Sequence, residues 1–292
     1  MDKFVSDQAA GLRRLLGQTG FQVITVMSGQ KGAGKTAATA NLAVALARSG
    51  RDVLIVDQDR HGQGAAAALG LTPRYDVADV LAGRCTLDAL MLAGPDNVQV
   101  LPLGGGFNRL GRLSEHDQEW LAQSFNHLQC GVDVVLVDME EATDPDALPL
   151  GLAASEIMVV LPPGSTAITQ AYTLVKRLAQ NFGKRQFRLL LNRMDSPEQA
   201  QAVARNFAHT AEQYLGVSVD YLGYIPVDER LSRAGRLHTS VVDAFPVAQS
   251  TSQFRKLADG LLRWPQPPSL GSVGGFMQRV IQGGRLVEAY RR

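Results

Sequence analysis

The sequence predicts an α/β protein whose main domain is built on a doubly wound, mostly parallel β-sheet. Three observations support this fold. Short apolar runs rich in Val, Ile and Leu recur along the chain, and helix-like stretches separate most of them. The first run leads directly into a glycine-rich loop and then into a helical stretch. Near-continuous apolar strands that alternate with helices are typical of a parallel sheet covered on both faces.

Length and composition limit the class of protein. The chain has 292 residues, with 29 Lys and Arg against 28 Asp and Glu, so no overall basic field favours nucleic acid and no direct nucleic-acid partner is expected. Its two cysteines, Cys85 and Cys130, are too few for a zinc site or a disulfide framework, which fits a reducing, cytoplasmic compartment. Neither a signal peptide nor a run of about 18 apolar residues is evident.

The order of these patterns predicts three parts. Residues 1–20 form a polar, helix-prone arm, residues 21–263 form the α/β domain, and residues 264–292 form a proline-rich linker and a tail. Strands are expected at 23–26, 51–57, 98–101, 132–137, 157–161, 189–191 and 221–225. Helices are expected at 35–49, 113–128, 166–182 and 197–215.

The glycine-rich loop reads Gly-Gln-Lys-Gly-Ala-Gly-Lys-Thr and matches the phosphate-binding pattern Gly-x-x-x-x-Gly-Lys-Thr. Glycines let successive backbone N–H groups converge on a phosphate, and the start of the following helix adds positive potential. Lys35 is expected to reach the β- and γ-phosphates and Thr36 to ligate Mg²⁺. The sequence therefore predicts an ATP–Mg²⁺ site whose loop residues are Gly29, Gln30, Lys31, Gly32, Ala33, Gly34, Lys35 and Thr36.

Carboxylates close two of the predicted strands, and ligands of open parallel sheets bind at the carboxyl ends of the strands. Asp138 follows the run 134–137 and is expected to hold Mg²⁺ through water. Asp57 and Asp59 follow the run 53–56 and are expected to orient Mg²⁺ or an attacking water. We assign Asp57 to the metal, and Asp59 together with Lys35 to catalysis. The alternative for each aspartate is a solvated strand end or a helix cap.

These residues, in this order, resemble the MinD/ParA group of deviant-Walker ATPases. The resemblance covers residues 21–262 and includes Leu-Asn-Arg at 191–193 and Ile-Pro-Val-Asp at 225–228. It implies a SIMIBI-class, MinD-like P-loop NTPase fold and a weak ATPase that hydrolyses ATP to ADP and phosphate. It also implies that Asn192 contacts the adenine and that the backbone at Pro226 and Val227 lies along the base.

Within this group the chain is most similar to the flagellar-number regulators of the FlhG or FleN subfamily. Residues 7–13 read Asp-Gln-Ala-Ala-Gly-Leu-Arg and match the subfamily's Asp-Gln-Ala-x-x-Leu-Arg motif, and residues 166–172 resemble a second segment of it. The resemblance implies that Gln8 enters the active site of the GTPase FlhF and stimulates hydrolysis in trans, and that flagellar C-ring proteins are further partners. An ordinary amphipathic helix is the alternative for the arm.

Two departures from the family pattern weigh against fast hydrolysis and ATP-driven homodimer formation more than against nucleotide binding. Gln30 replaces the lysine that crosses the family's dimer to the partner's phosphates, and Lys31 stands one place later. After the Walker B aspartate the family has a small, glycine-bearing switch, whereas this chain has Met-Glu-Glu-Ala at 139–142. Uncompensated, Glu140 and Glu141 would repel a triphosphate.

The tail, residues 273–292, combines apolar and basic side chains at helical spacing: Phe276, Met277, Val280 and Ile281 beside Arg279, Arg285, Arg291 and Arg292. This composition suits an anionic membrane surface, and family members carry a C-terminal amphipathic membrane helix. Four glycines weaken such a helix. A tail that packs back on its own domain or on a partner is therefore the alternative.

Our favoured interpretation is an ATP-dependent spatial regulator of flagellar number and placement that alternates between a cytoplasmic monomer and a membrane-bound homodimer. A second interpretation is a degenerate ParA-like scaffold that does not hydrolyse ATP and uses the Gln8 arm as its functional part. A third is a MinD-like regulator of another polar or secretion machine. A metabolic P-loop enzyme would need a second pocket of convergent polar groups, and the sequence offers no such constellation.

Overall fold

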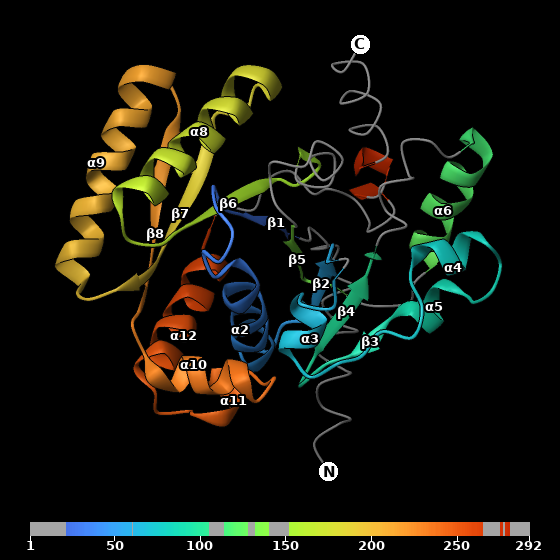
Figure 1. The fold of residues 1–292 in the computed structure, drawn as a ribbon. Coiled ribbons are helices and arrows are strands. Elements are labelled where there is room, and N and C mark those ends of the chain that lie inside the picture. The colour runs from blue at the N-terminus through green and yellow to red at the C-terminus, as the bar shows by residue number, and fades with distance from the viewer. Residues whose placement is uncertain are drawn as a thin grey trace.

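The computed structural model describes residues 22–59, 61–104, 114–127, 132–139, 152–264, 275–276 and 278–280. These residues form an eight-stranded sheet with helices on both faces (Figure 1). The strand order is β3-β4-β2-β5-β1-β6-β7-β8, and within it the β3–β4 pair is antiparallel while the other neighbours are parallel. This arrangement confirms the predicted doubly wound α/β class.

The strands are β1 (Gln22–Met27), β2 (Val53–Asp57), β3 (Leu92–Ala93), β4 (Val98–Pro102), β5 (Val134–Asp138), β6 (Glu156–Leu161), β7 (Gln186–Met194) and β8 (Ser218–Pro226). The helices are α2 (Lys35–Arg48), α3 (Ala65–Ala68), α4 (Val77–Leu81), α5 (Leu87–Leu90), α6 (Glu115–His127), α8 (Ser165–Phe182), α9 (Pro197–Leu215), α10 (Glu229–Arg236), α11 (Val241–Ala244) and α12 (Gln249–Leu262).

The centre of the sheet positions the glycine-rich loop. Strand β1 lies between β5 and β6, and all of its residues are buried. β2 and β5 are also buried throughout, as expected for parallel strands covered on both faces. The parallel register places Asp57 opposite Asp138 and Val26 opposite Asp138. The loop after β1 and the two strand-closing aspartates therefore emerge at the same edge of the sheet.

Two hydrophobic clusters cover the two faces of the sheet. On what we call the α8 face, α4, α5, α6, α8 and α9 pack against one set of strand side chains, including Val23 and Met27. On the α2 face, α2, α3, α10, α11 and α12 pack against the other set, including Ile24 and Val26. The alternation along β1 is the period of two that a strand imposes on its side chains.

The described part of the tail belongs to the α8 face. Phe276 and Val280 are 0% and 1% exposed and form part of that face's cluster. Of the two alternatives for the tail, packing back on its own domain agrees with this burial, and a membrane-facing role for Phe276 or Val280 would require the tail to leave this position. Met277 and residues 281–292 lie outside the described residues. Among the residues that the structure describes, no helix is long and apolar enough to cross a bilayer.

Candidate nucleotide-binding site

The glycine-rich loop packs directly against helix α8. A Cβ atom on Gly29 would lie 2.3 Å from the backbone carbon of Gln170, so a larger residue would push the loop and α8 apart. Gly32 and Gly34 have φ angles of 73° and 92°, in the left-handed region that favours glycine. Ser28 Oγ donates a hydrogen bond of 2.7 Å to the carbonyl oxygen of Gln30. Local geometry therefore explains why glycine is required at positions 29, 32 and 34.

Helix α2 begins at Lys35 and presents its first turn to the loop. Its N-cap is Gly34, which has no side chain to cap the first backbone N–H groups. Those N–H groups and the positive end of the helix dipole favour an anion at this point. Lys35 and Thr36 are half-buried, whereas Lys31 is exposed. The strand, the glycine-rich loop and the helix follow one another as the motif predicts, and the binding of phosphate by this loop stays a prediction.

Two buried carboxylates lie beside this loop. Asp57 and Asp138 are each 3% exposed, and they are register partners at the ends of neighbouring strands. Burial, and next the nearby charge of Asp57, raise the pKa of Asp138 to about 7, although Lys35 and the hydroxyls of Thr36 and Thr39 act in the opposite direction. A pair of adjacent buried carboxylates is unfavourable without a compensating cation. Their oxygen ligands and the Thr36 hydroxyl fit Mg²⁺.

Both oxygens of Asp57 already accept backbone hydrogen bonds. Oδ1 accepts from the N–H of Asp59 at 3.1 Å, and Oδ2 accepts from the N–H of Ala66 at 2.8 Å. Burial raises the pKa of Asp57. A Cβ on Gly64 would lie 2.2 Å from Asp57 Oδ1, so the chain closes tightly around this side chain. Asp57 organises the turn into α3, and its assignment to the metal stays a prediction.

Asp59 shows the geometry of a local cap. Its Oδ2 accepts hydrogen bonds from the N–H groups of His61 at 3.1 Å and Gln63 at 2.7 Å. This is the capping alternative named for the strand-end aspartates, and the catalytic assignment of Asp59 stays a prediction. Among the described residues no group of three or more His, Cys, Asp or Glu gathers as a metal site. A metal at Asp138 would therefore draw further ligands from Thr36, phosphate oxygens or water.

Asn192, near the end of β7, contacts the glycine-rich loop. Its Nδ2 donates a hydrogen bond of 2.8 Å to the carbonyl oxygen of Ala33, although the two residues are 159 positions apart. The same nitrogen lies 2.2 Å from where a Cβ on Gly34 would stand. The next residue, Arg193, has a φ of 58°, and the β7–β8 pairing shifts its register between Asn192 and Met194. The predicted base-contacting residue thus meets the loop.

The other two residues predicted to lie along the base stand at the end of β8, where Pro226 is the last strand residue and Val227 follows it. Pro226 is buried and Val227 is 62% exposed, while the N–H of Val227 donates to the carbonyl oxygen of Met194 at 3.2 Å. Exposure of Val227 leaves this backbone segment open on one side. Gln8, Glu140 and Glu141 lie outside the described residues.

Thr39 was not among the site residues predicted from the sequence. The Thr39 side chain is fully buried, and its hydroxyl lies 3.0 Å from the carbonyl oxygen of Lys35 and 3.4 Å from Asp138 Oδ1. A threonine inside a helix usually bonds only its own helix. Its position four residues after Lys35, on the same face of α2, was the available signal.

Comparison with known proteins agrees with this geometry. The family model for the CobQ/CobB/MinD/ParA nucleotide binding domain matches residues 24–241. The chain belongs to this family. It is 34% identical over 262 residues to the antiactivator FleN of Pseudomonas aeruginosa, covering 89% of this chain and 94% of FleN. It is 30% identical over 216 residues to the septum site-determining protein MinD of Synechocystis, covering 72% of this chain and 77% of that protein.

Solved MinD structures share the fold. MinD from Pyrococcus horikoshii, complexed with Mg-ADP, superposes with a TM-score of 0.64 at 25% identity and covers 83% of this chain and 96% of its own. The MinD cell division protein of Aquifex aeolicus gives 0.63 at 22% identity, over 84% of this chain and 98% of its own. The likeness to MinD/ParA proteins therefore covers most of the α/β domain, and the residues that the family model matches, 24–241, include the glycine-rich loop, Asp138 and Asn192.

Proposed function

We propose that this chain binds ATP with Mg²⁺ and acts as a FleN-like regulator of flagellar number and placement. The observation that carries the nucleotide assignment is the junction at the glycine-rich loop. There Asn192 bonds the loop from one side, and Asp57 and Asp138 lie buried at the neighbouring strand ends. The likeness to FleN over 89% of the chain supports the regulatory role.

At the phosphate end, the chain supplies a cation, a helix start and oxygen ligands. Lys35 pairs with the β- and γ-phosphates, and the first turn of α2 donates its backbone N–H groups to them. Thr36 and Asp138 hold Mg²⁺, which when bound shields the negative charge of the phosphates. Binding of the metal also neutralises the buried pair Asp57 and Asp138. The Mg-ADP complex of the P. horikoshii relative supports this assignment.

At the base end, Asn192 selects adenine. One of the two N–H groups of its Nδ2 donates to the carbonyl oxygen of Ala33, which fixes the orientation of the amide and of its acceptor, Oδ1. The exocyclic amino group of adenine donates a hydrogen bond to such an acceptor, whereas guanine presents a carbonyl oxygen at the same place. Because two acceptors facing each other are unfavourable, GTP should bind more weakly than ATP.

Hydrolysis is proposed to be slow. Gln30 lacks the charge of the family's dimer-crossing lysine, so the homodimer loses one cation at each phosphate chain. Measuring ATP turnover and sedimentation of the wild type and Gln30→Lys checks this. A larger ATP-dependent dimer fraction in Gln30→Lys supports the loss of this cation, whereas equal fractions mean that Lys31 already substitutes for it or that ATP does not drive a homodimer. If the wild type binds ATP and neither protein turns it over, the non-hydrolysing scaffold gains support.

The regulatory role assigns the arm to a GTPase partner of the FlhF type, with flagellar C-ring proteins and a transcriptional activator as further partners. The antiactivator FleN supports the last of these. A peptide of residues 1–17 should accelerate GTP hydrolysis by the cognate GTPase, because a glutamine amide can orient an attacking water. Gln8→Ala should remove most of the effect without preventing binding, whereas Leu12→Asp should abolish binding. GTP turnover that the peptide leaves unchanged contradicts the flagellar role but not nucleotide binding.

Attachment to an anionic membrane surface would require the tail to leave the α8 face. Phe276→Ala should destabilise the full chain by about 3–5 kcal/mol, because it deletes a fully buried aromatic ring. The control Gln278→Ala changes an exposed neighbour and should stay within about 0.5 kcal/mol. Denaturant unfolding compares the two. If both variants match the wild type, the tail is not part of the folded core.

A further inference from the structure

The segment that follows Val227 is tied to the start of helix α12. Asp228 Oδ1 accepts a hydrogen bond from the N–H of Arg230 at 2.8 Å and so caps α10. Its Oδ2 accepts from the N–H of Ser250 at 3.0 Å and from Ser250 Oγ at 2.7 Å. One carboxylate therefore joins the start of α10 to the first turn of a helix 22 positions later, and Asp228 directly follows Val227 in the chain.

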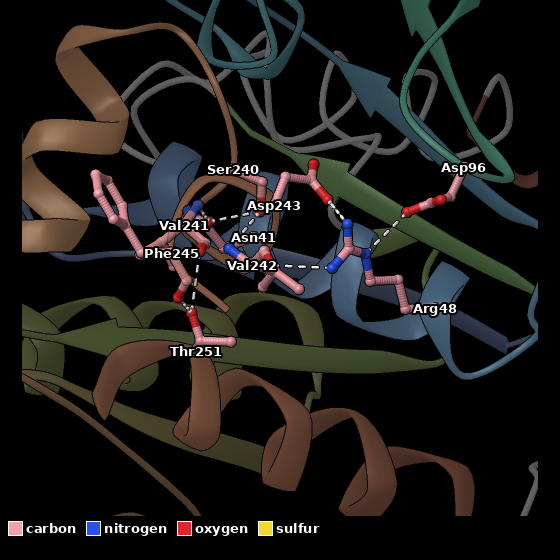
Figure 2. A network of polar contacts seen from close by, with 9 residues as sticks. All are labelled: Asn41, Arg48, Asp96, Ser240, Val241, Val242, Asp243, Phe245 and Thr251. Carbon is pink, nitrogen blue, oxygen red and sulfur yellow. Dashed lines mark hydrogen bonds and ion pairs between the residues drawn. The ribbon is translucent and has the colours of Figure 1, made fainter. Parts of the chain in front are cut away.

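The next residue of α12 continues this connection towards the glycine-rich loop. The fully buried Thr251 hydroxyl lies 3.0 Å from the carbonyl oxygen of Val241 and 2.8 Å from that of Phe245 (Figure 2). On the other side, the hydroxyl of Ser240 and the N–H of Val241 both donate to Asn41 Oδ1, at 2.9 and 2.7 Å. Asn41 belongs to α2, the helix that begins at Lys35.

Further contacts fix α11 to the same helix. Arg48, the last residue of α2, donates to the carbonyl oxygen of Val242 at 3.0 Å and pairs with the carboxylate of Asp243 (Figure 2). Asn41 Nδ2 donates to the carbonyl oxygen of Ala37 within α2. The phosphate-binding helix and the start of α12 are thus joined through α11 by largely buried polar contacts. Such contacts permit few alternative arrangements, because each broken bond leaves a buried polar group without its partner.

Polar contacts matter at Val227 because its side chain has little apolar packing, although Pro226 before it is buried. Val227 is 62% exposed, and its N–H donates to the strand neighbour Met194. Partial burial alone would raise the pKa of Asp228, but the hydrogen bonds from Ser250 and Arg230 outweigh it and lower the pKa. Asp228 is therefore ionised at neutral pH and makes charge-assisted bonds, which are stronger than neutral ones.

We propose that Asp228 is a positioning residue for base recognition: held by Ser250, it fixes the Pro226–Val227 backbone at a set place relative to the phosphate-binding helix. The proposal rests on the proposed ATP site and adds to it a residue that does not touch the nucleotide. A preformed base segment meets adenine without first being ordered, which removes an entropic cost from binding. Binding of the phosphates by the glycine-rich loop does not depend on the contact between Asp228 and Ser250.

Separate titrations of MgATP and of inorganic tripolyphosphate with Mg²⁺ test the proposal on the full-length protein. Tripolyphosphate engages only the phosphate loop, so the ratio of the two affinities isolates the contribution of the base end. In Asp228→Asn and Ser250→Ala, the affinity for MgATP should fall by about tenfold and about threefold respectively, while that for tripolyphosphate stays within about twofold. The control Asp259→Asn makes the same chemical change at an exposed site of α12 and should leave both affinities unchanged.

The outcomes separate the positioning role from the proposed function. A wild type that binds tripolyphosphate and MgATP equally overturns base recognition at this site, and the positioning role with it. A wild type that prefers MgATP, together with variants whose two affinities fall in parallel or not at all, overturns the positioning role alone. If Asp228→Asn does not fold, Ser250→Ala carries the test, because it removes one hydrogen bond and leaves the helix cap on Arg230 in place.

Discussion

The two ends of the nucleotide site are built in different ways. The core of the phosphate end is one contiguous segment of eight residues, 29–36, whose last two open helix α2, and Asp57 and Asp138 close the strands beside it. The base end is assembled from β7, β8 and α12, and Asn192 reaches the loop across 159 positions. A contiguous site is specified by its local pattern, whereas a distributed one depends on the packing of the whole domain.

The two ends also differ in how their surroundings affect the charge of a carboxylate. The phosphate end gathers buried carboxylates beside Lys35, and burial raises the pKa of Asp138 to about 7. At the base end, the carboxylate of Asp228 has its pKa lowered by the hydrogen bonds from Ser250 and Arg230, against the effect of partial burial. Ionised Asp138 therefore lowers the stability of the ligand-free protein, whereas ionised Asp228 raises it.

The largest expected effect is on the free energy of unfolding, which the buried, ionised carboxylate of Asp138 lowers. Because its folded pKa lies above the ordinary value of 3.8, stability falls as pH rises from about 4 to about 7 and then stays level. Asp138→Asn removes this cost and should stabilise the ligand-free protein at pH 8 by up to about 4 kcal/mol, with the difference vanishing near pH 4. Urea unfolding at the two pH values measures it. A variant that is less stable than the wild type at pH 8 contradicts the electrostatic account.

A substitution at Gly34 should disturb both ends at once, because the loop and Asn192 meet there. Gly34→Ala forces a side chain into a φ of 92° and against Asn192 Nδ2, so MgATP affinity should fall about a hundredfold or more. Gly32→Ala is the matched control: its φ is 73°, but an added Cβ meets no described atom within 4 Å, and a loss of about tenfold is expected from strain alone. Titration calorimetry compares them. Equal losses would show that the contact with Asn192 is unimportant.

The smallest expected effect concerns the stability that Asp228 contributes. Its lowered pKa means that the contribution is present above about pH 4 and is lost as pH falls through the folded pKa. Asp228→Asn keeps an oxygen that can cap α10 but loses the charged acceptor of the two Ser250 bonds, so it should destabilise the protein at pH 7 by about 0.5–1.5 kcal/mol, and by less at pH 3.5. This loss of stability is opposite in sign to the gain expected for Asp138→Asn. A variant with the same sign of change as Asp138→Asn would erase the distinction between the two ends.

The regular parts of the fold could be predicted from the sequence. Helix α9 has the predicted bounds, since Ser196 caps its start, Pro197 is its first residue and Gly216 ends it in the left-handed conformation. Short elements were missed. Strand β3 and helices α3, α4, α5 and α11 span two to five residues, too few to show a period. Helix α12 was missed although it has 14 residues, because polar Ser250 and Thr251 occupy buried positions at its start.

The site divides in the same way. The positions of the loop, Asp57 and Asp138 at one edge of the sheet could be predicted, because the loop follows β1 and each aspartate closes its strand. The contacts of Thr39 with Asp138, of Asp228 with Ser250 and of Asn41 with Ser240 could not, because each pairs residues that only the folded chain brings together. Asn192 was identified through family resemblance, and its bond to Ala33 is a feature of the fold.

The central claim is that Lys35 and the loop around it bind ATP with Mg²⁺. Titration calorimetry of MgATP with the full-length wild type, Lys35→Ala and the exposed control Lys256→Ala tests it most directly. The affinity of Lys35→Ala should be at least about tenfold lower, since the loop loses the cation that its motif places at the phosphates. Lys256→Ala should match the wild type. An affinity for MgATP that is the same in all three proteins would contradict the claim.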